Sequence, residues 1–153
     1  MARRAGIHLF STIDGPLPAI MVDRGKFVRL LNNLLSNAVK FTPEGGEIEF
    51  KAEPAEEIAG RIPEQLYPGL RLPERGKFLQ ISVRDTGIGI PAVALGTIFD
   101  RYMQAKSRRL SKTQGTGLGL AFCRKVMDAH QGYIWAESEE GKGSTFYLLF
   151  PIE

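Results

Sequence analysis

The sequence contains one cysteine, two histidines and one tryptophan among its 153 residues. A single cysteine, Cys123, excludes an internal disulfide framework, and its place in a helical apolar pattern fits a reducing compartment. No apolar run reaches the ~18 residues of a membrane-spanning helix, and the first residues lack the pattern of a signal peptide. We therefore expect a soluble, cytoplasmic domain.

The excess of charge of one sign is also small. The formal net charge is +3, from 20 lysines and arginines against 17 acidic residues, and no long basic run occurs, so nucleic-acid binding is not predicted. A basic cluster lies next to a glycine-rich segment and consists of Lys106, Arg108, Arg109 and Lys112. Binding of a nucleotide triphosphate explains this cluster as readily as binding of nucleic acid. The length suits one domain, which we expect to comprise residues 1–153.

Residues 23–42 carry two stripes along one predicted helix. The apolar stripe, with its spacing of three and four, consists of Phe27, Leu31, Leu34, Leu35 and Ala38. Asn33, Asn37 and Lys40 follow at i, i+4 and i+7 on another face, although asparagine is a mediocre helix former. An amide oxygen can bind Mg²⁺, and a lysine one turn on can meet the phosphates that this ion bridges. Taken alone, the polar stripe is explained equally well as a solvated helix face.

Three glycine-rich motifs follow this helix. DTGIGI at 85–90 ends a strand-like run, GTGLGL at 115–120 opens an amphipathic helix, and GKGSTF at 141–146 enters a final strand. Glycines 115, 117 and 119 would let backbone amides approach an anion at a helix N-terminus, where the helix dipole favours negative charge. The motifs predict a phosphate site whose spacing matches neither the dinucleotide fingerprint nor the P-loop.

An asparagine helix followed by these three motifs in this order resembles the catalytic ATP-binding domain of sensor histidine kinases. That family belongs to the ATPase superfamily shared by gyrase, the heat-shock chaperone ATPases and the mismatch-repair protein MutL. The resemblance covers about residues 7–151 and rests on LLSNAVKFTP, DTGIGIP and GTGLGL. It implies ATP and Mg²⁺ as ligands, and a longer protein, membrane-anchored or not. Its partners would be a helical dimerisation domain that carries the phosphoacceptor histidine and a downstream response regulator.

The resemblance also implies roles for residues around the base. Asp85 would accept a hydrogen bond from the adenine amino group, Gly87 and Gly89 would keep the wall of the base pocket close, and Thr145 would place a hydroxyl near Asp85. Arg101 and Lys112 are candidates on the side of a nucleotide lid, residues 103–114, whose amino-acid sequence departs from the one usual in the family. The other ATP-binding candidates are Ile90, Phe99, Tyr102, Gly115, Thr116, Gly117, Leu118, Gly119 and Leu120.

The catalytic residues implied by the resemblance lie on the first helix. Asn37 would ligate Mg²⁺, Asn33 would support the metal or phosphate site, and Lys40 would contact phosphate. In the hydrolysing relatives a glutamate stands in place of Asn33 and activates water, which an amide cannot do. A histidine acceptor needs no such base, so phosphoryl transfer to histidine is favoured. The alternatives are a dimerising ATPase clamp of the gyrase or MutL type and a nucleotide-binding serine kinase or anti-sigma-like switch.

The expected fold is an α/β (α+β) two-layer sandwich with a mixed, mainly antiparallel sheet covered by about three helices, the Bergerat-type ATP-binding fold. The predicted strands are 7–13, 47–52, 78–84, 132–137 and 144–150, and the predicted helices are 23–42, 91–99 and one from 118 onward. Residues 53–76, an insertion with four of the nine prolines, are predicted to be a surface loop with one helical turn from Pro54, rather than a partner site. His8 is not predicted to be the phosphoacceptor, because it lies in a strand and lacks the neighbours typical of that helix. His130 is expected to be structural.

Overall fold

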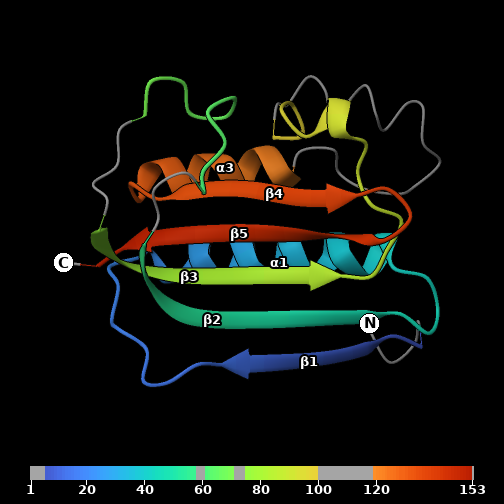
Figure 1. Ribbon diagram of the computed structural model, residues 1–153. Helices are drawn as coiled ribbons and strands as arrows, with labels where there is room; N and C mark the ends of the chain where they lie inside the picture. The colour runs from blue at the N-terminus through green and yellow to red at the C-terminus, as the bar shows by residue number, and fades with distance from the viewer. Residues whose placement is uncertain (1–5, 58–60, 71–74, 100–118, 153) are drawn as a thin grey trace.

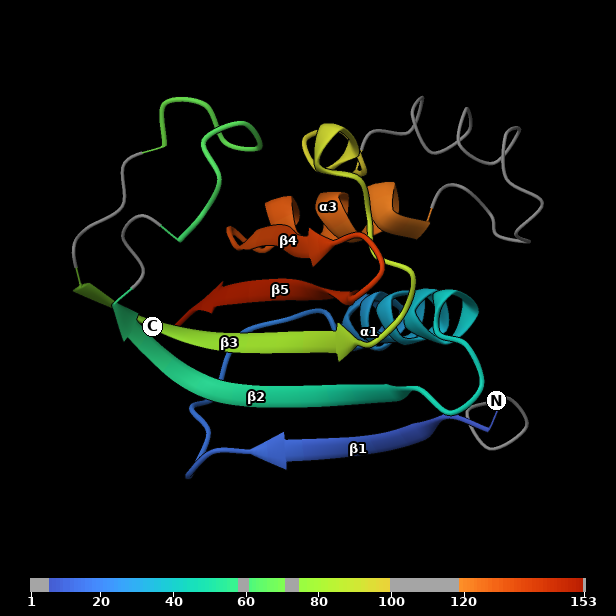
Figure 2. The same cartoon turned by 45° about the vertical axis from the view of Figure 1, so that its right-hand side comes forward.

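The computed structural model describes residues 6–57, 61–70, 75–99 and 119–152. Along the chain lie β1 (His8–Ile13), α1 (Arg24–Phe41), β2 (Glu47–Glu57), β3 (Arg75–Asp85), the 3-10 helix η1 (Ala92–Ala94), α3 (Gly119–Ala129), β4 (Tyr133–Glu139) and β5 (Gly143–Pro151). The strands form one sheet in the order β1-β2-β3-β5-β4, with β1 parallel to β2 and the other pairs antiparallel. Helices α1 and α3 cover the same face of the sheet (Figures 1 and 2), which confirms the two-layer α/β sandwich.

Helix α1 begins and ends where its sequence predicts. The Asp23 carboxylate caps it by accepting a hydrogen bond from the Lys26 amide, 2.9 Å away. Thr42, which precedes a proline, leaves the helical conformation with ψ 120°. The fully buried side chains are Leu30, Leu34 and Ala38. Leu30 was missing from the predicted apolar stripe; a strict i+4 row faces the sheet here, while Phe27, Leu31 and Leu35 are only partly buried.

The prediction for residues 53–76 was partly wrong. Residues 53–57 continue β2 and β3 begins at 75, so no helical turn starts at Pro54, which pairs with Leu79. The carbonyl of Ala52 accepts a hydrogen bond from the amide of Asp14, on the β1 side of β2. Two residues further on, the nitrogen of Pro54 faces that same side, where β1 has already ended. A proline is tolerated there because no ladder hydrogen bond is lost.

Residues 61–70 cover the open edge of β4. The Tyr67 hydroxyl accepts a hydrogen bond from the Ile134 amide at 2.8 Å and lies 3.4 Å from the Ile134 carbonyl oxygen. The Arg124 guanidinium of α3 lies 4.0 Å from the Tyr67 ring centre and donates to the Leu66 carbonyl at 3.0 Å. This part of the insertion is therefore folded onto the domain, with the Leu66 side chain buried.

One helix prediction also needs correction. Residues 91–99 form only a single 3-10 turn followed by further turns, with hydrogen bonds of three-residue spacing such as Ala94 to Pro91. On α3 the buried side chains are Ala121, Cys123, Val126 and Met127. Phe122, one turn before Val126, lies partly exposed beneath the Arg29 guanidinium, 4.1 Å from its ring centre. Leu118 lies outside the described residues.

Both histidines are accounted for. His130 ends α3 and contacts the start of α1: its Nε2 accepts a hydrogen bond from the Asp23 amide at 2.9 Å, and its Nδ1 lies 2.7 Å from the Val126 carbonyl oxygen. The proton is thus on Nδ1, and these contacts are structural, as expected. His8 lies in β1 with its ring stacked on Phe10 at 5.2 Å.

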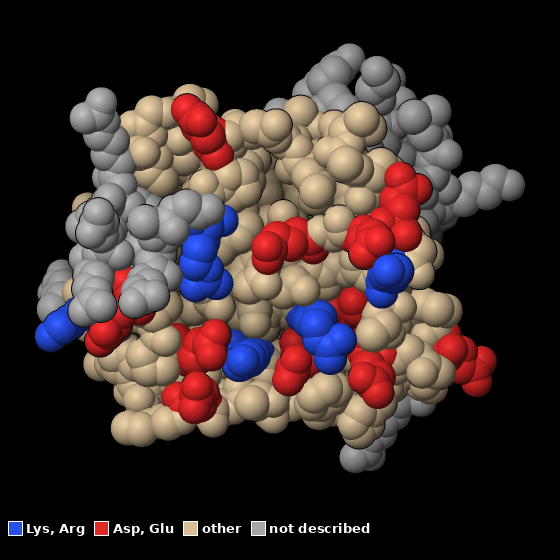
Figure 3. Space-filling model, viewed as in Figure 1, with Lys and Arg blue, Asp and Glu red and all other residues tan. Residues whose placement is uncertain are grey.

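The two faces of the sheet differ. The helix-facing side holds apolar cross-strand pairs, Leu79–Phe150, Ile81–Leu148 and Val83–Phe146. The opposite side, seen in Figure 3, carries basic and acidic side chains interleaved over the sheet, including the ion pairs Arg84–Glu49 at 3.3 Å and Lys51–Glu53 at 3.4 Å. Among the described residues, basic and acidic side chains therefore alternate on this face (Figure 3) instead of separating into a basic patch.

Candidate functional site

The helix-facing side of the sheet changes from apolar to polar at its last row. Asp85 ends β3 and pairs with Ser144 of β5, which in turn pairs with Ser138 of β4. Strand alternation puts all three side chains on the face that carries Val83 and Phe146 one row earlier. Asp85 and Ser144 are buried, at 6% and 7% exposed, while Ser138 at the end of this polar row is partly buried.

Asp85 is held by backbone donors. Its Oδ1 accepts a hydrogen bond from the Gly87 amide at 2.9 Å, and its carboxylate also accepts one from the Ser144 amide. Burial raises the pKa of Asp85 above its ordinary value, and these two hydrogen bonds and the Arg84 charge only partly oppose that effect. A buried carboxylate on the helix-facing side of the sheet is a strong acceptor for an amino group of a ligand.

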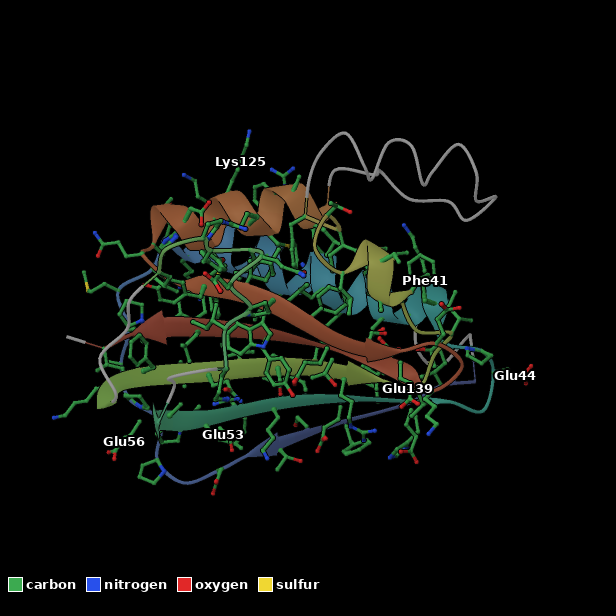
Figure 4. The ribbon with its side chains drawn as sticks, turned by 45° about the horizontal axis from the view of Figure 1, so that its top comes forward. Phe41, Glu44, Glu53, Glu56, Lys125 and Glu139 are labelled. Carbon is green, nitrogen blue, oxygen red and sulfur yellow. The ribbon has the colours of Figure 1, made fainter. Side chains whose placement is uncertain are left out.

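The chain packs against itself at glycines around Asp85. A Cβ on Gly87 would lie 2.3 Å from the Phe41 carbonyl oxygen at the end of α1, and one on Gly143 would lie 2.1 Å from the Asp85 carbonyl oxygen. Gly89 has φ +78°, and a Cβ there would lie 2.3 Å from the Glu139 carbonyl oxygen. Residues 87–89 are thus wedged between α1 and the β4–β5 hairpin, and Phe41 and Glu139 lie at this end of the molecule in Figure 4.

Backbone hydrogen bonds fix this wedge. The Ile88 amide donates to the Phe41 carbonyl at 3.1 Å, and the Gly141 amide donates to the Ile88 carbonyl at 2.8 Å. The Ile90 amide donates to the Ser138 hydroxyl at 2.7 Å. The loop after Asp85 is therefore tied to both layers of the fold, and Asn37, one helical turn before Phe41, lies on the same side of the sheet as Asp85.

The polar stripe of α1 is split between two environments. The Asn33 side chain hydrogen-bonds the Cys123 thiol on α3; burial raises the pKa of this thiol to about 12, and the Asn33 bond opposes the increase. Asn37 is partly buried and Lys40 is exposed. Asn33 thus has a contact that joins α1 to α3, which the sequence did not indicate.

Other predicted site residues lie near the same end. Phe99 is 4% exposed and packs edge-on against Phe146, with ring centres 6.2 Å apart. Gly119 and Leu120 are the partly buried first residues of α3. The remaining predicted site residues lie outside the described residues: Arg101, Tyr102, Lys112, Gly115, Thr116, Gly117 and Leu118.

Thr145 does not lie near Asp85 as expected. It pairs with Arg84 and Glu137 on the opposite face of the sheet, and Ser144 is the hydroxyl residue beside Asp85. Because side chains alternate along a strand, an error of one residue moves a hydroxyl to the other face. Ser138 was also missed, although the alternation of the two hairpin strands around residues 139–143 would have paired it with Ser144.

No group of three or more His, Cys, Asp or Glu side chains is placed to hold a metal within the described ranges. The residues nevertheless fit a magnesium ion that arrives with a nucleotide. Mg²⁺ keeps several waters and is commonly held by one or two protein oxygens together with substrate phosphates. The partly buried amide of Asn37 on α1 carries an oxygen of this kind.

Comparison with known proteins identifies the family of this chain. Residues 22–153 match the family described as histidine kinase-, DNA gyrase B- and HSP90-like ATPase. The chain is 39% identical to the sensor histidine kinase WalK of Bacillus subtilis over 88% of its length and 19% of WalK. It is 35% identical to the adaptive-response sensory kinase SasA of Synechococcus elongatus, over 95% of its length and 32% of SasA. The chain thus spans about a fifth to a third of the curated relatives.

Solved structures give the same result. The nucleotide-free catalytic domain of histidine kinase ThkA superposes with a TM-score of 0.73 and 29% identity, over 98% of this chain and 82% of ThkA. Full-length ShkA in complex with AMPPNP gives a TM-score of 0.71 and 29% identity, over 98% of this chain and 26% of ShkA. The chain belongs to the histidine kinase-, DNA gyrase B- and HSP90-like ATPase family, and its fold and its relatives are those of sensor histidine kinase catalytic domains.

Proposed function

We propose that this chain is the ATP-binding catalytic domain, residues 1–153, of a two-component sensor histidine kinase. It binds Mg-ATP and donates the γ-phosphoryl group to a histidine on a separate helical dimerisation domain of the same protein. The phosphohistidine then passes the group to an aspartate of a response regulator. The buried Cys123 thiol fits a reducing, cytoplasmic environment, and no helix in the described part of the chain is long and apolar enough to cross a membrane.

The observation that carries this proposal is the buried Asp85 at the end of β3. Its carboxylate is enclosed by glycines that allow close backbone approach, and it lies on the helix-facing side of the sheet. An adenine amino group would donate to it, whereas guanine presents an acceptor at the corresponding place. The bound nucleotide would supply phosphates and Mg²⁺, with Asn37 as an oxygen ligand of the ion and Lys40 as a phosphate contact.

The chemical step needs no base from the chain. A neutral imidazole already offers a lone pair to phosphorus, so the domain contributes position and charge neutralisation. Asn33 is an amide bonded to the Cys123 thiol and cannot accept a proton from water. This argues for transfer to histidine over a dimerising ATPase clamp, which would need a general base at that place.

Nucleotide binding is the first test. Calorimetry with Mg-ADP is expected to show binding by the unchanged chain and a loss of roughly one to two orders of magnitude in affinity for Asp85→Asn, because a hydrogen bond to a buried charged group is removed. Asn37→Asp is expected to weaken binding as well, since it changes the ligand of the ion. Unchanged affinity in both variants would contradict the site.

Phosphoryl transfer is the second test. The chain is mixed with ATP and a separately produced dimerisation domain, and the label is expected on a histidine, recognised by its lability in acid. The chain alone should show little autophosphorylation. Steady release of phosphate without transfer would instead support the ATPase clamp.

A further inference from the structure

Ser138 belongs to no glycine-rich motif, and its hydroxyl contacts three other groups. Its hydroxyl oxygen lies 2.7 Å from the Ile90 amide, 2.8 Å from the Ser144 hydroxyl and 2.9 Å from the Gly143 carbonyl oxygen. These partners come from the loop after Asp85 and from the start of β5, so one side chain of β4 links the two segments that enclose Asp85.

The number of protons in this cluster limits which hydrogen bonds can form at the same time. A hydroxyl has one proton to donate and two lone pairs to accept with. The Ile90 amide can only donate and occupies one lone pair of Ser138, so the Ser138 proton goes either to the Gly143 carbonyl or to the Ser144 oxygen.

The two arrangements give Ser144 opposite properties. If Ser138 donates to Gly143, Ser144 donates its own proton to Ser138 and offers a ligand only lone pairs. If Ser138 donates to Ser144, the Ser144 proton is free and can be donated to a ligand. The heavy atoms stay in place, so Ser144 can present a donor or an acceptor beside Asp85 without movement.

We propose that Ser138 is a positioning residue of the nucleotide site, which holds the Ile90 amide and sets the hydrogen-bonding direction of the Ser144 hydroxyl next to the base bound by Asp85. This inference rests on the proposed function, because the ligand is the adenine nucleotide proposed above. Ser138 acts through Ser144 and the 87–90 loop and needs no contact with the nucleotide.

The test is a double-mutant cycle read by Mg-ADP affinity. Ser138→Ala and Ser144→Ala are each expected to weaken binding roughly tenfold, the effect of losing one well-placed hydrogen bond at a buried site. The double variant should bind about as well as the weaker single variant, because both changes remove the same hydrogen bond between the two serines. Ser138→Thr keeps the hydroxyl and is expected to restore binding, and Ser138→Cys, close in volume to serine, replaces Ser138→Ala should the alanine variant not fold.

Ser82→Ala is the matched control. Ser82 lies on β3 and is also buried, at 8% exposed, but it pairs with Tyr147 on the other face of the sheet. Its substitution should leave Mg-ADP affinity unchanged. Wild-type affinity in both Ser138→Ala and Ser138→Cys, or additive effects in the cycle, would overturn the inference while Asp85→Asn still weakened binding. Absence of binding by the unchanged chain would overturn the proposed function and this inference with it.

Discussion

At the scale of single residues, the buried Asp85 carboxylate lowers the stability of the fold but provides the site with a hydrogen-bond acceptor. Its carboxylate is buried with two backbone donors. Within the described part of the chain it has no basic partner on its own face of the sheet, since the paired residue Ser144 is uncharged and Arg84 points to the other side. Burial therefore outweighs the favourable interactions and raises its pKa. Binding residues commonly show this pattern, in which an ionised group is kept at some expense in stability.

The pKa of Asp85 predicts a pH dependence of stability. A raised pKa in the folded state means that the native protein binds more protons than the unfolded chain between the ordinary value of 3.8 and the raised value. The contribution of Asp85 to the free energy of unfolding is thus greatest at low pH and falls as the pH rises through that window. Asp85→Asn, which keeps the shape but carries no charge, should be as stable as wild type or more stable at neutral pH.

Urea unfolding of both proteins across the acid range measures this difference. The stability of Asp85→Asn relative to wild type should grow as the pH rises through the window and then stay constant. The pKa of Glu49 is lowered, chiefly by the Thr12 hydrogen bond, and acts in the opposite direction, but it is present in both proteins and cancels. A variant that is less stable than wild type at neutral pH would show that Asp85 stabilises the fold.

At the scale of elements, one edge of the sheet is covered by the segment between β2 and β3. The outer edge of β4 is covered by residues 61–70, whose Tyr67 hydroxyl bonds the Ile134 backbone. Unpaired backbone groups on an edge strand invite pairing with another chain, so this cover protects β4. The insertion that looked like a surface loop in sequence is here part of the sheet's edge.

Tyr67→Phe tests whether this cover stabilises and protects the edge of β4. The substitution keeps the ring under Arg124 but leaves the Ile134 amide and carbonyl without their partner, which should lower the free energy of unfolding by about 1 kcal/mol. Tyr133→Phe is the control, because Tyr133 contributes its ring to the contact with Tyr67, at 5.2 Å between ring centres. Hydrogen exchange should show faster exchange of the Ile134 amide in Tyr67→Phe alone. Equal exchange in the two variants would argue against a protective role.

At the scale of the whole molecule, sequence predicted the parts that depend on local rules. The bounds of α1, the order of the glycine motifs and the sheet with helices on one face follow from spacing and turn chemistry, and Asp85 is found at the end of β3. The errors arose where tertiary contacts decide. Thr145 was exchanged for Ser144 because motif matching does not track the alternation of β5, and the extension of β2 through Pro54 depends on where the neighbouring strand β1 ends.

The two layers meet at the site through Gly87, and that junction can be tested. A methyl group there would lie 2.3 Å from the Phe41 carbonyl oxygen and 2.8 Å from the Asp85 carboxylate, so Gly87→Ala must push α1 away from the end of β3. We expect a loss of stability of about 1–3 kcal/mol from overpacking, with Mg-ADP affinity reduced because Asn37 and Asp85 no longer keep their spacing.

Gly25→Ala is the matched control on the same helix. Its added Cβ would meet only the Asp23 carboxylate oxygen at an ordinary 3.6 Å, and replacing a helical glycine should stabilise the protein by about 0.5–1 kcal/mol while leaving nucleotide affinity unchanged. Thermal unfolding with and without Mg-ADP separates the two effects, because bound ligand raises the midpoint only as far as the site remains intact. If Mg-ADP raised the unfolding midpoint of Gly87→Ala as much as that of the wild type, the spacing between the layers would not determine the affinity. Nucleotide binding would then depend only on the residues at the end of the sheet.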